Sequence, residues 1–215
     1  ATAIAGSGYE SSTDIDLLLD SAEAKIFEIT ASREQRGFAP LREIVRDTFK
    51  RVEEIYNRKE PITGLGTGFT RLDNLTSGFQ PGDLVIVAGR PSMGKTAFAL
   101  GVAQNAALRD RLPVAIFSLE MSKEQLVMRM LASEARVDGQ RLRRGTLRET
   151  DWPKLAKAAG ALSDAPIYVD DSGVISVLEM RARARRLQAE KGLGLVVVAY
   201  LQLMHGRGGN DGRER

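Results

Sequence analysis

Cysteine is absent from this chain, which excludes disulfide bonds and thiolate metal sites and agrees with a reducing compartment. There is one histidine, His205, which cannot hold a transition metal without other ligands. No stretch approaches the roughly 18–20 apolar residues that a membrane-spanning helix needs. Residues 1–8 lack the basic start and the long apolar centre of a signal peptide. These absences predict a cytoplasmic protein without a membrane partner.

The composition is that of a globular chain. Of its 215 residues, 43% are hydrophobic, which is enough for one sizeable core with an appendage. The formal net charge of +3 permits a polyanionic partner but does not require one.

Residues 84–100 are the most informative stretch. The apolar run 84–88 is typical of a strand buried on both faces. A G-x-x-x-x-G-K-T pattern follows, and apolar residues at helical spacing come after it. In such a P-loop, backbone N–H groups and the helix N-terminus bind phosphate oxygens. The residues of the pattern are Gly89, Arg90, Pro91, Ser92, Met93, Gly94, Lys95 and Thr96.

The pattern assigns a role to its last two residues. We expect Lys95 to reach the β- and γ-phosphates of a nucleoside triphosphate, and the Thr96 hydroxyl to hold Mg²⁺.

Two helices are expected before this motif. The first spans about residues 13–29 and resembles the end of a preceding domain, and residues 30–39 are linker-like. The second spans 40–58 and carries an apolar stripe that either packs on its own subunit or docks on a neighbouring one. The stripe consists of Leu41, Ile44, Val45, Phe49, Val52, Ile55 and Tyr56.

After the motif, apolar runs alternate with helical patterns. With the run 84–88, the sequence predicts four strands, the others at 114–119, 167–169 and 195–198. This alternation predicts an α/β fold with three layers and a mostly parallel sheet.

Acidic residues follow two of these strands. Glu120 comes directly after 114–119, at the edge where parallel sheets bind ligands, so it is a candidate to activate water against the γ-phosphate. Asp170 and Asp171 follow 167–169, whereas the more hydrophobic strand 195–198 ends in Ala199. By pattern alone, Asp170 is the better candidate to support the metal.

Basic residues elsewhere give weaker signals. Arg141, Arg143 and Arg144 lie beside a glycine in an expected loop, and arginines at 181–186 spread around an expected helix over 176–190. Trp152 does not interleave with basic residues as a base-stacking platform would.

Several segments resemble DnaB-family replicative DNA helicases. They are the P-loop at 89–96 and three further segments: Thr67-Gly-Phe-Thr-Arg-Leu-Asp73, Phe117-Ser-Leu-Glu-Met-Ser122 and Val197-Val-Ala-Tyr-Leu-Gln-Leu-Met204. The resemblance implies a RecA-like ATPase domain over 61–215, preceded by a linker helix within 31–60 and by the end of an N-terminal domain over 1–30.

The resemblance also implies an activity and its residues. Lys95 and Thr96 would bind ATP and Mg²⁺, and Glu120 would be the catalytic carboxylate. The position of the metal-supporting aspartate is taken by Ala199, which implies impaired hydrolysis. The family's arginine finger and most of its DNA-binding loops would fall beyond Arg215, so we expect this chain to be a fragment.

The implied partners are those of a replicative helicase. They are further copies of the chain in a homo-hexamer, single-stranded DNA, a primase and a helicase loader. In the hexamer, the stripe on helix 40–58 would dock on the adjacent subunit. Two other functions stay open: a RecA/RadA-type recombinase ATPase, and a nucleotide-binding assembly module that does not hydrolyse.

Overall fold

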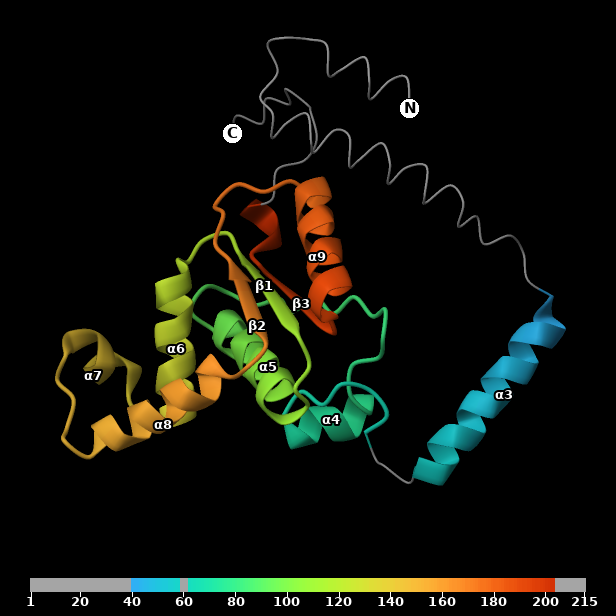
Figure 1. Cartoon of the computed structure of the whole chain (residues 1–215), viewed down its shortest axis with the longest axis horizontal. Helices are drawn as coiled ribbons and strands as arrows, with labels where there is room; N and C mark the ends of the chain where they lie inside the picture. Colours follow the sequence, from blue (N-terminus) through green and yellow to red (C-terminus); the bar gives the residue numbers. More distant parts are fainter. Residues whose placement is uncertain (1–39, 59–61, 204–215) are drawn as a thin grey trace, which may run out of the picture. The chain divides into compact units, whose positions relative to one another are not determined.

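A computed structural model describes residues 40–58 and 62–203 of the chain (Figure 1). The helix expected over 13–29, the expected domain 1–30 and His205 lie outside these residues.

The chain divides into two compact units, residues 1–60 with 178–183 and residues 61–177 with 184–215. The first contains α3, and the second contains the sheet. The described elements are α3 (Leu41–Arg58), α4 (Thr70–Thr76), α5 (Lys95–Arg109), β1 (Val114–Ser118), α6 (Lys123–Ala135), α7 (Gly139–Arg144), α8 (Asp151–Ser163), β2 (Ile167–Asp170), α9 (Val177–Lys191), β3 (Leu195–Ala199) and the 3₁₀ turn η1 (Leu201–Leu203).

The sheet of the described residues has three parallel strands in the order β2-β1-β3. The first residue of β1, Val114, pairs with Ile167 on one side and with Leu195 on the other, so the three strands begin level. All five residues of β1 are buried, as its apolar sequence predicts for a central strand. The parallel α/β sheet is thus confirmed for three of the four expected strands.

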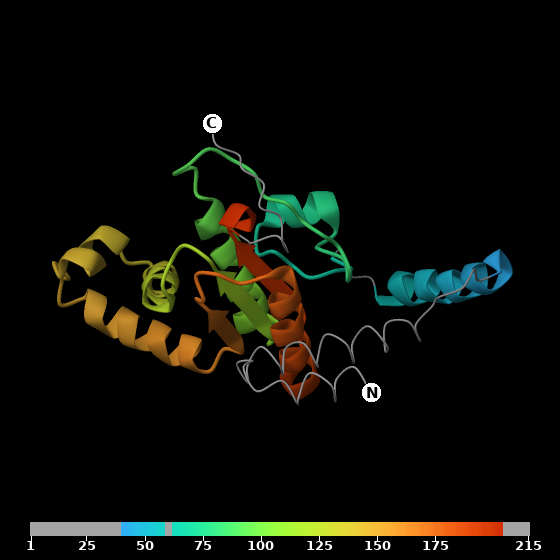
Figure 2. The same cartoon turned by 90° about the horizontal axis from the view of Figure 1, so that it is seen from above.

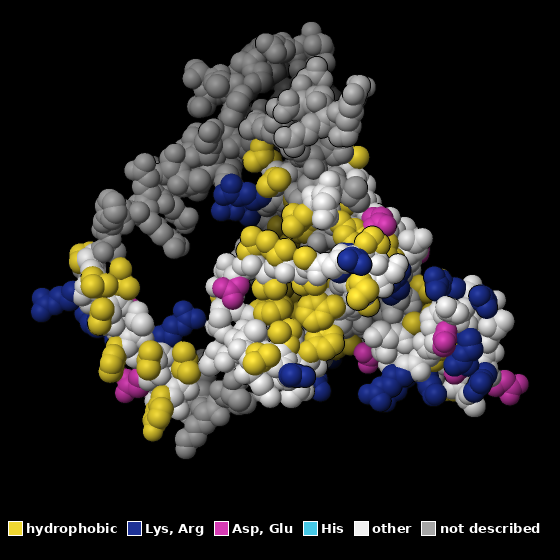
Figure 3. All heavy atoms as spheres, turned by 180° about the vertical axis from the view of Figure 1, so that it is seen from behind, with side chains coloured by type: hydrophobic (Ala, Val, Ile, Leu, Met, Phe, Trp, Pro, Cys, Tyr) yellow, Lys and Arg dark blue, Asp and Glu magenta, His cyan; other side chains and the backbone are white. Residues whose placement is uncertain are grey.

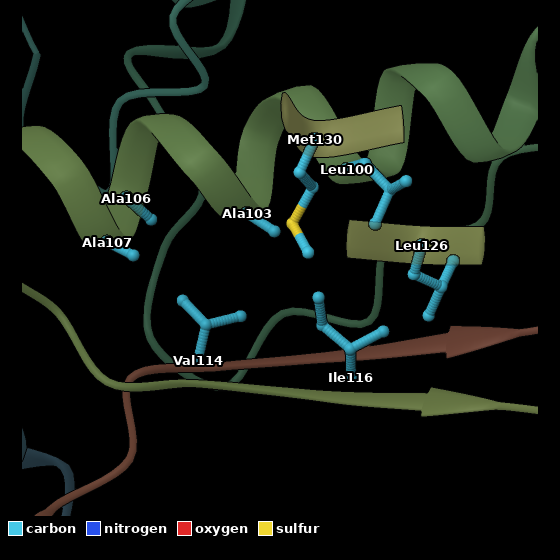
Figure 4. Close-up of a cluster of buried hydrophobic side chains, with 8 residues drawn as sticks. All are labelled: Leu100, Ala103, Ala106, Ala107, Val114, Ile116, Leu126 and Met130. Carbon is cyan, nitrogen blue, oxygen red and sulfur yellow. The ribbon is translucent and has the colours of Figure 1, made fainter. Parts of the chain in front are cut away.

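The core lies between β1 and the helices α5 and α6 (Figure 4). Val114 and Ile116 point from the strand towards α5, and neither is more than 2% exposed. Alanines on α5 let the helix lie close to the strands, since a methyl group takes little room between backbones. The core side chains are Leu100, Ala103, Ala106, Ala107, Val114, Ile116, Leu126 and Met130.

Helices α6, α7 and α8 lie together at one side of the sheet (Figures 1 and 2). They enclose a second cluster of buried apolar side chains, among them Val137 and Leu155. The loop expected around Arg141, Arg143 and Arg144 is in fact helix α7. The Asp138 carboxylate caps this helix by accepting hydrogen bonds from the backbone N–H groups of Gln140 and Arg141, at 2.7 and 3.1 Å.

The prediction of a buried strand over residues 84–88 is wrong in this structure. The segment belongs to no strand, and the side chains of Leu84 and Ile86 are 83% and 69% exposed. It borders a hollow of about 500 Å³ together with Leu72 and Phe98 instead of pairing with a strand. An apolar run favours burial, but it becomes a strand only where another strand supplies hydrogen-bond partners for its backbone.

Helix α3 forms over the predicted residues, and its apolar stripe is exposed. Phe49 and Tyr56, for example, are 72% and 79% exposed, and hydrophobic side chains are visible along this helix in Figure 3. The structure therefore confirms the amphipathic helix, while the choice between the two expected docking surfaces stays a prediction.

Candidate functional site

The loop 89–94 is exposed and leads directly into α5. Ser92 and Gly94 adopt positive φ angles of 66° and 89° within it. Gly94 precedes α5, and no side chain caps that helix. The backbone N–H groups of the first turn of α5 are therefore available to an anion, as the sequence pattern predicts for a phosphate site.

The Lys95 ammonium lies against the first residues of this loop. Its Nζ donates hydrogen bonds to the carbonyl oxygens of Gly89 and Arg90, at 2.7 and 3.2 Å. These hydrogen bonds keep the positively charged Lys95 ammonium beside the uncapped N-terminus of α5. Both features attract the oxygens of a phosphate group.

Thr96, the next residue of α5, contacts the end of β3. The Thr96 Oγ1 and the Tyr200 hydroxyl oxygen lie 3.0 Å apart, a hydrogen-bonding distance between residues 104 positions apart. The Lys95 Nζ also lies 5.5 Å from the centroid of the Tyr200 ring. The structure thus brings the residue after β3 against both side chains that the pattern assigns to the nucleotide and its Mg²⁺.

Sequence reasoning missed Tyr200 as part of this site. Its position directly after a strand was the available signal, because the carboxyl ends of parallel strands share one edge of the sheet.

Glu120 lies at the same edge of the sheet. Ser118, the last residue of β1, pairs with Ala199, and the Leu119 N–H donates to the Ala199 carbonyl at 2.7 Å. Glu120 follows with an exposed side chain. The expected catalytic carboxylate and the ends of β1 and β3 therefore occupy one edge of the sheet.

The two aspartates at the end of β2 have other partners. Asp170 accepts a hydrogen bond from the Ser172 N–H at 3.0 Å, and Asp171 accepts one from the Lys123 N–H at the start of α6 at 3.1 Å. Because β1 separates β2 from β3, neither aspartate is on a strand next to Ala199. This arrangement therefore offers no support for the pattern-based prediction that Asp170 supports the metal.

The chemistry of the donors indicates how a divalent cation would be held. Among residues 40–58 and 62–203, no group of three or more histidine or carboxylate side chains is arranged to hold a metal ion. Mg²⁺ commonly takes only one or two protein ligands and fills its shell with water and phosphate oxygens. The Thr96 hydroxyl beside a phosphate loop fits such an ion, which would arrive with the nucleotide.

The Thr67–Asp73 segment lies against the outer face of α5. The buried Asp73 carboxylate accepts hydrogen bonds from the Thr67 N–H at 2.8 Å and from the Thr67 hydroxyl at 2.6 Å. The Phe69 ring stacks on Phe98 of α5, with centroids 4.9 Å apart, and the Asn105 amide donates to the Gly66 carbonyl at 2.9 Å. This segment therefore helps to position the helix that carries Lys95 and Thr96.

The basic side chains of α7 do not gather at the phosphate loop. Arg141 donates a hydrogen bond to the buried Asp151 carboxylate at 3.0 Å, which joins α7 to α8. Trp152 is 62% exposed on α8.

No helix of the described residues is long and apolar enough to cross a membrane.

Known proteins match this chain over most of its length. The replicative DNA helicase DnaB of Geobacillus stearothermophilus is 51% identical over 208 residues, which are 97% of this chain and 46% of that protein. The replicative DNA helicase DnaC of Bacillus subtilis is 49% identical, with 100% of this chain and 48% of that protein covered. The chain thus spans about half the length of these relatives.

Solved structures share the fold. The ATPase domain of G40P matches with a TM-score of 0.73 and 34% identity over 82% of this chain and 62% of that one. A DnaB-like replicative helicase, described with its interactions with primase, matches with a TM-score of 0.71 and 32% identity over 91% of this chain and 47% of that one. The parallel sheet with flanking helices is therefore the RecA-like fold of these ATPase domains, as predicted.

The family model that matches this chain covers the candidate site. Residues 64–215 match the family described as the DnaB-like helicase C terminal domain, and this match includes the phosphate loop, Glu120 and the end of β3. The chain therefore belongs to the family of DnaB-like helicase C-terminal domains.

Proposed function

We propose that residues 61–215 belong to the ATP-hydrolysing motor of a replicative DNA helicase, preceded by a linker within residues 31–60. The observation that carries this proposal is the loop 89–96, where the Lys95 ammonium lies beside the uncapped N-terminus of α5. The relatives are replicative DNA helicases, and the fold is that of their ATPase domains.

Each residue of the site has a distinct task. The backbone of the loop binds the phosphates of ATP, and Lys95 leaves its carbonyl partners to offset the charge on the β- and γ-phosphates. The Thr96 hydroxyl would hold Mg²⁺, which would supply charge neutralisation at the phosphate oxygens when bound. Glu120 accepts a proton from the water that attacks the γ-phosphorus, while the bond from the γ-phosphorus to the bridging oxygen breaks.

Turnover by the chain with and without single-stranded DNA tests this proposal. Glu120→Gln removes the proton acceptor but keeps the shape of the side chain, so we expect it to abolish turnover while nucleotide still binds. Binding without turnover in both the parent chain and Ala199→Asp would instead favour a nucleotide-binding assembly module. Strand exchange without unwinding of a forked duplex would favour a recombinase.

Ala199 bears on how fast this chain hydrolyses ATP. A carboxylate at the end of β3 would support the cation, and loss of such a partner typically lowers metal affinity or activity about 10–100-fold. We therefore expect slow turnover that Ala199→Asp raises. Equal rates for the parent chain and Ala199→Asp in a full-length ring would make Asp170 the residue to test.

The proposed partners are further copies of the chain in a hexamer, single-stranded DNA, a primase and a helicase loader. The similarity to a helicase described with its primase interactions supports the primase. The exposed stripe on α3 supports docking on another subunit, because an apolar helix face favours burial. If so, replacing Phe49 and Val52 by aspartate should dissociate the oligomer in light scattering, and an unchanged mass would contradict this docking.

A further inference from the structure

Tyr200, the residue directly after β3, lies against the phosphate loop and has no task in the function described above. Its hydroxyl oxygen lies 3.0 Å from Thr96 Oγ1, and its ring lies 5.5 Å from the Lys95 ammonium. Ala199, directly before it, has no polar side chain. The contact to Thr96 therefore comes from the residue next to the one that lacks a carboxylate.

The hydroxyl of Thr96 has one proton and two lone pairs, and so does that of Tyr200. If Tyr200 donates to Thr96, one lone pair of the Thr96 oxygen is occupied. If Thr96 donates to Tyr200, both lone pairs of Thr96 are free to face a cation. Donation by Thr96 therefore leaves its oxygen most open to a cation, and it needs a hydrogen-bond acceptor nearby.

The Tyr200 hydroxyl oxygen is such an acceptor, at 3.0 Å from Thr96 Oγ1. The Lys95 ammonium lies within the distance of about 6 Å at which a cation is attracted to an aromatic face. Because Lys95 is itself bonded to the Gly89 and Arg90 carbonyls, the three groups form one connected arrangement. In this arrangement the Tyr200 hydroxyl lies at hydrogen-bonding distance from Thr96 while its ring lies beside Lys95.

We propose that Tyr200 is a positioning residue of the nucleotide site, which accepts the Thr96 proton and so turns the Thr96 oxygen towards the cation that accompanies the nucleotide. In this chain it takes over the acceptor role that Ala199 cannot provide. This inference rests on the proposed function, since it needs a nucleotide and its cation at the loop.

Binding measurements test the inference without relying on hydrolysis. The affinity of the 215-residue chain for a non-hydrolysable ATP analogue is measured by calorimetry in Mg²⁺ and in EDTA, and the ratio of the two is the Mg²⁺ dependence. Tyr200→Phe keeps the ring beside Lys95 but removes the acceptor. We expect it to lower the Mg²⁺ dependence about 10-fold, the lower end of the effect of losing a group that orients a metal ligand.

Tyr200→Phe is also measured in two variant chains, to distinguish the orientation of Thr96 from a general loss of nucleotide binding. In Thr96→Val there is no proton to accept, so adding Tyr200→Phe should change nothing more. In Ala199→Asp the new carboxylate can accept the Thr96 proton, so Tyr200→Phe should have a smaller effect than in the parent chain. Tyr168→Phe is the matched control, because it removes a tyrosine hydroxyl from β2, away from Thr96.

The outcomes are distinct. An unchanged Mg²⁺ dependence in a Tyr200→Phe chain that melts like its parent overturns the inference. An equal loss in the Ala199→Asp background, or in Tyr168→Phe, also overturns it. If the parent chain binds no nucleotide, the proposed function fails and the inference with it, whereas binding that Tyr200→Phe leaves unaltered overturns the inference alone.

Discussion

Two passages of this chain have the same local pattern and different structures. Residues 84–109 and 114–135 each begin with a run of mostly apolar residues, continue through a short turn and enter a helix whose first residue is lysine. In the second passage the run is the buried central strand β1, whereas in the first it is exposed and outside the sheet.

The starts of the two helices differ as well. Ser122 caps α6 by accepting a hydrogen bond from the Gln125 N–H, and Asp171 accepts one from the Lys123 N–H. The start of α5 has Gly94 and no side-chain cap. Side chains accept hydrogen bonds from N–H groups at the start of α6, which stabilises that helix. The first-turn N–H groups of α5 have no side-chain cap and are available to a ligand.

The largest expected effect concerns the two runs, and a matched pair of isoleucines tests it. Ile116 is 2% exposed in β1 and Ile86 is 69% exposed in the first run. We expect Ile116→Ala to lower the free energy of unfolding by about 2–5 kcal/mol and Ile86→Ala by no more than about 0.5 kcal/mol. Urea denaturation measures both, and equal losses would show that residues 84–88 are buried in solution.

The next effect concerns the lysines that begin the two helices. Lys95→Ala removes a charged donor from the phosphate loop, so ATP binding should weaken about 10- to 100-fold, equivalent to about 1.4–2.8 kcal/mol. Lys123→Ala is the matched control, because Lys123 faces Asp171 at 3.9 Å and not the loop. Calorimetric titration compares the two, and equal affinities would contradict the site.

A smaller effect concerns the cap of α6. Ser122→Ala leaves the Gln125 N–H without its acceptor, so the free energy of unfolding should fall by about 1 kcal/mol. Ser133→Ala, an exposed serine within the same helix, should change it by less than about 0.5 kcal/mol. Thermal unfolding of both variants checks this, and equal melting temperatures would mean that the cap is not formed.

The smallest effect is on a pKa. The Ser122 side chain and then the backbone N–H of Glu124 itself hold the pKa of the Glu124 carboxyl below its usual value. Because the pKa is lower in the folded chain, this interaction stabilises the chain above the unfolded pKa and is lost as the pH falls through the folded one.

Ser122→Ala should therefore raise the pKa of Glu124, as followed by NMR titration. The pKa of Asp138, lowered by the Arg141 and Gln140 N–H groups, should not move. A Glu124 titration that is the same in both chains would rule out the serine as the cause.

The phosphate loop and most elements of the fold were predictable from the sequence, because they depend on local signals. Glycines, a lysine and a threonine at fixed spacing, and apolar residues at helical or strand spacing, predict the P-loop, α3, α5 and β1 from a few neighbouring residues each. Glu120 was predicted as a site residue in the same way, by its place after a strand.

Other features depend on contacts between distant residues, and only the tertiary structure decided them. The run 84–88 is as apolar as a buried strand, but its place depends on whether another strand offers backbone partners. Tyr200 approaches Thr96 because β3 lies beside β1 and α5 packs against both strands. Local sequence determines what a segment favours, whereas pairing and packing determine which segments meet, since these depend on groups far apart in the chain.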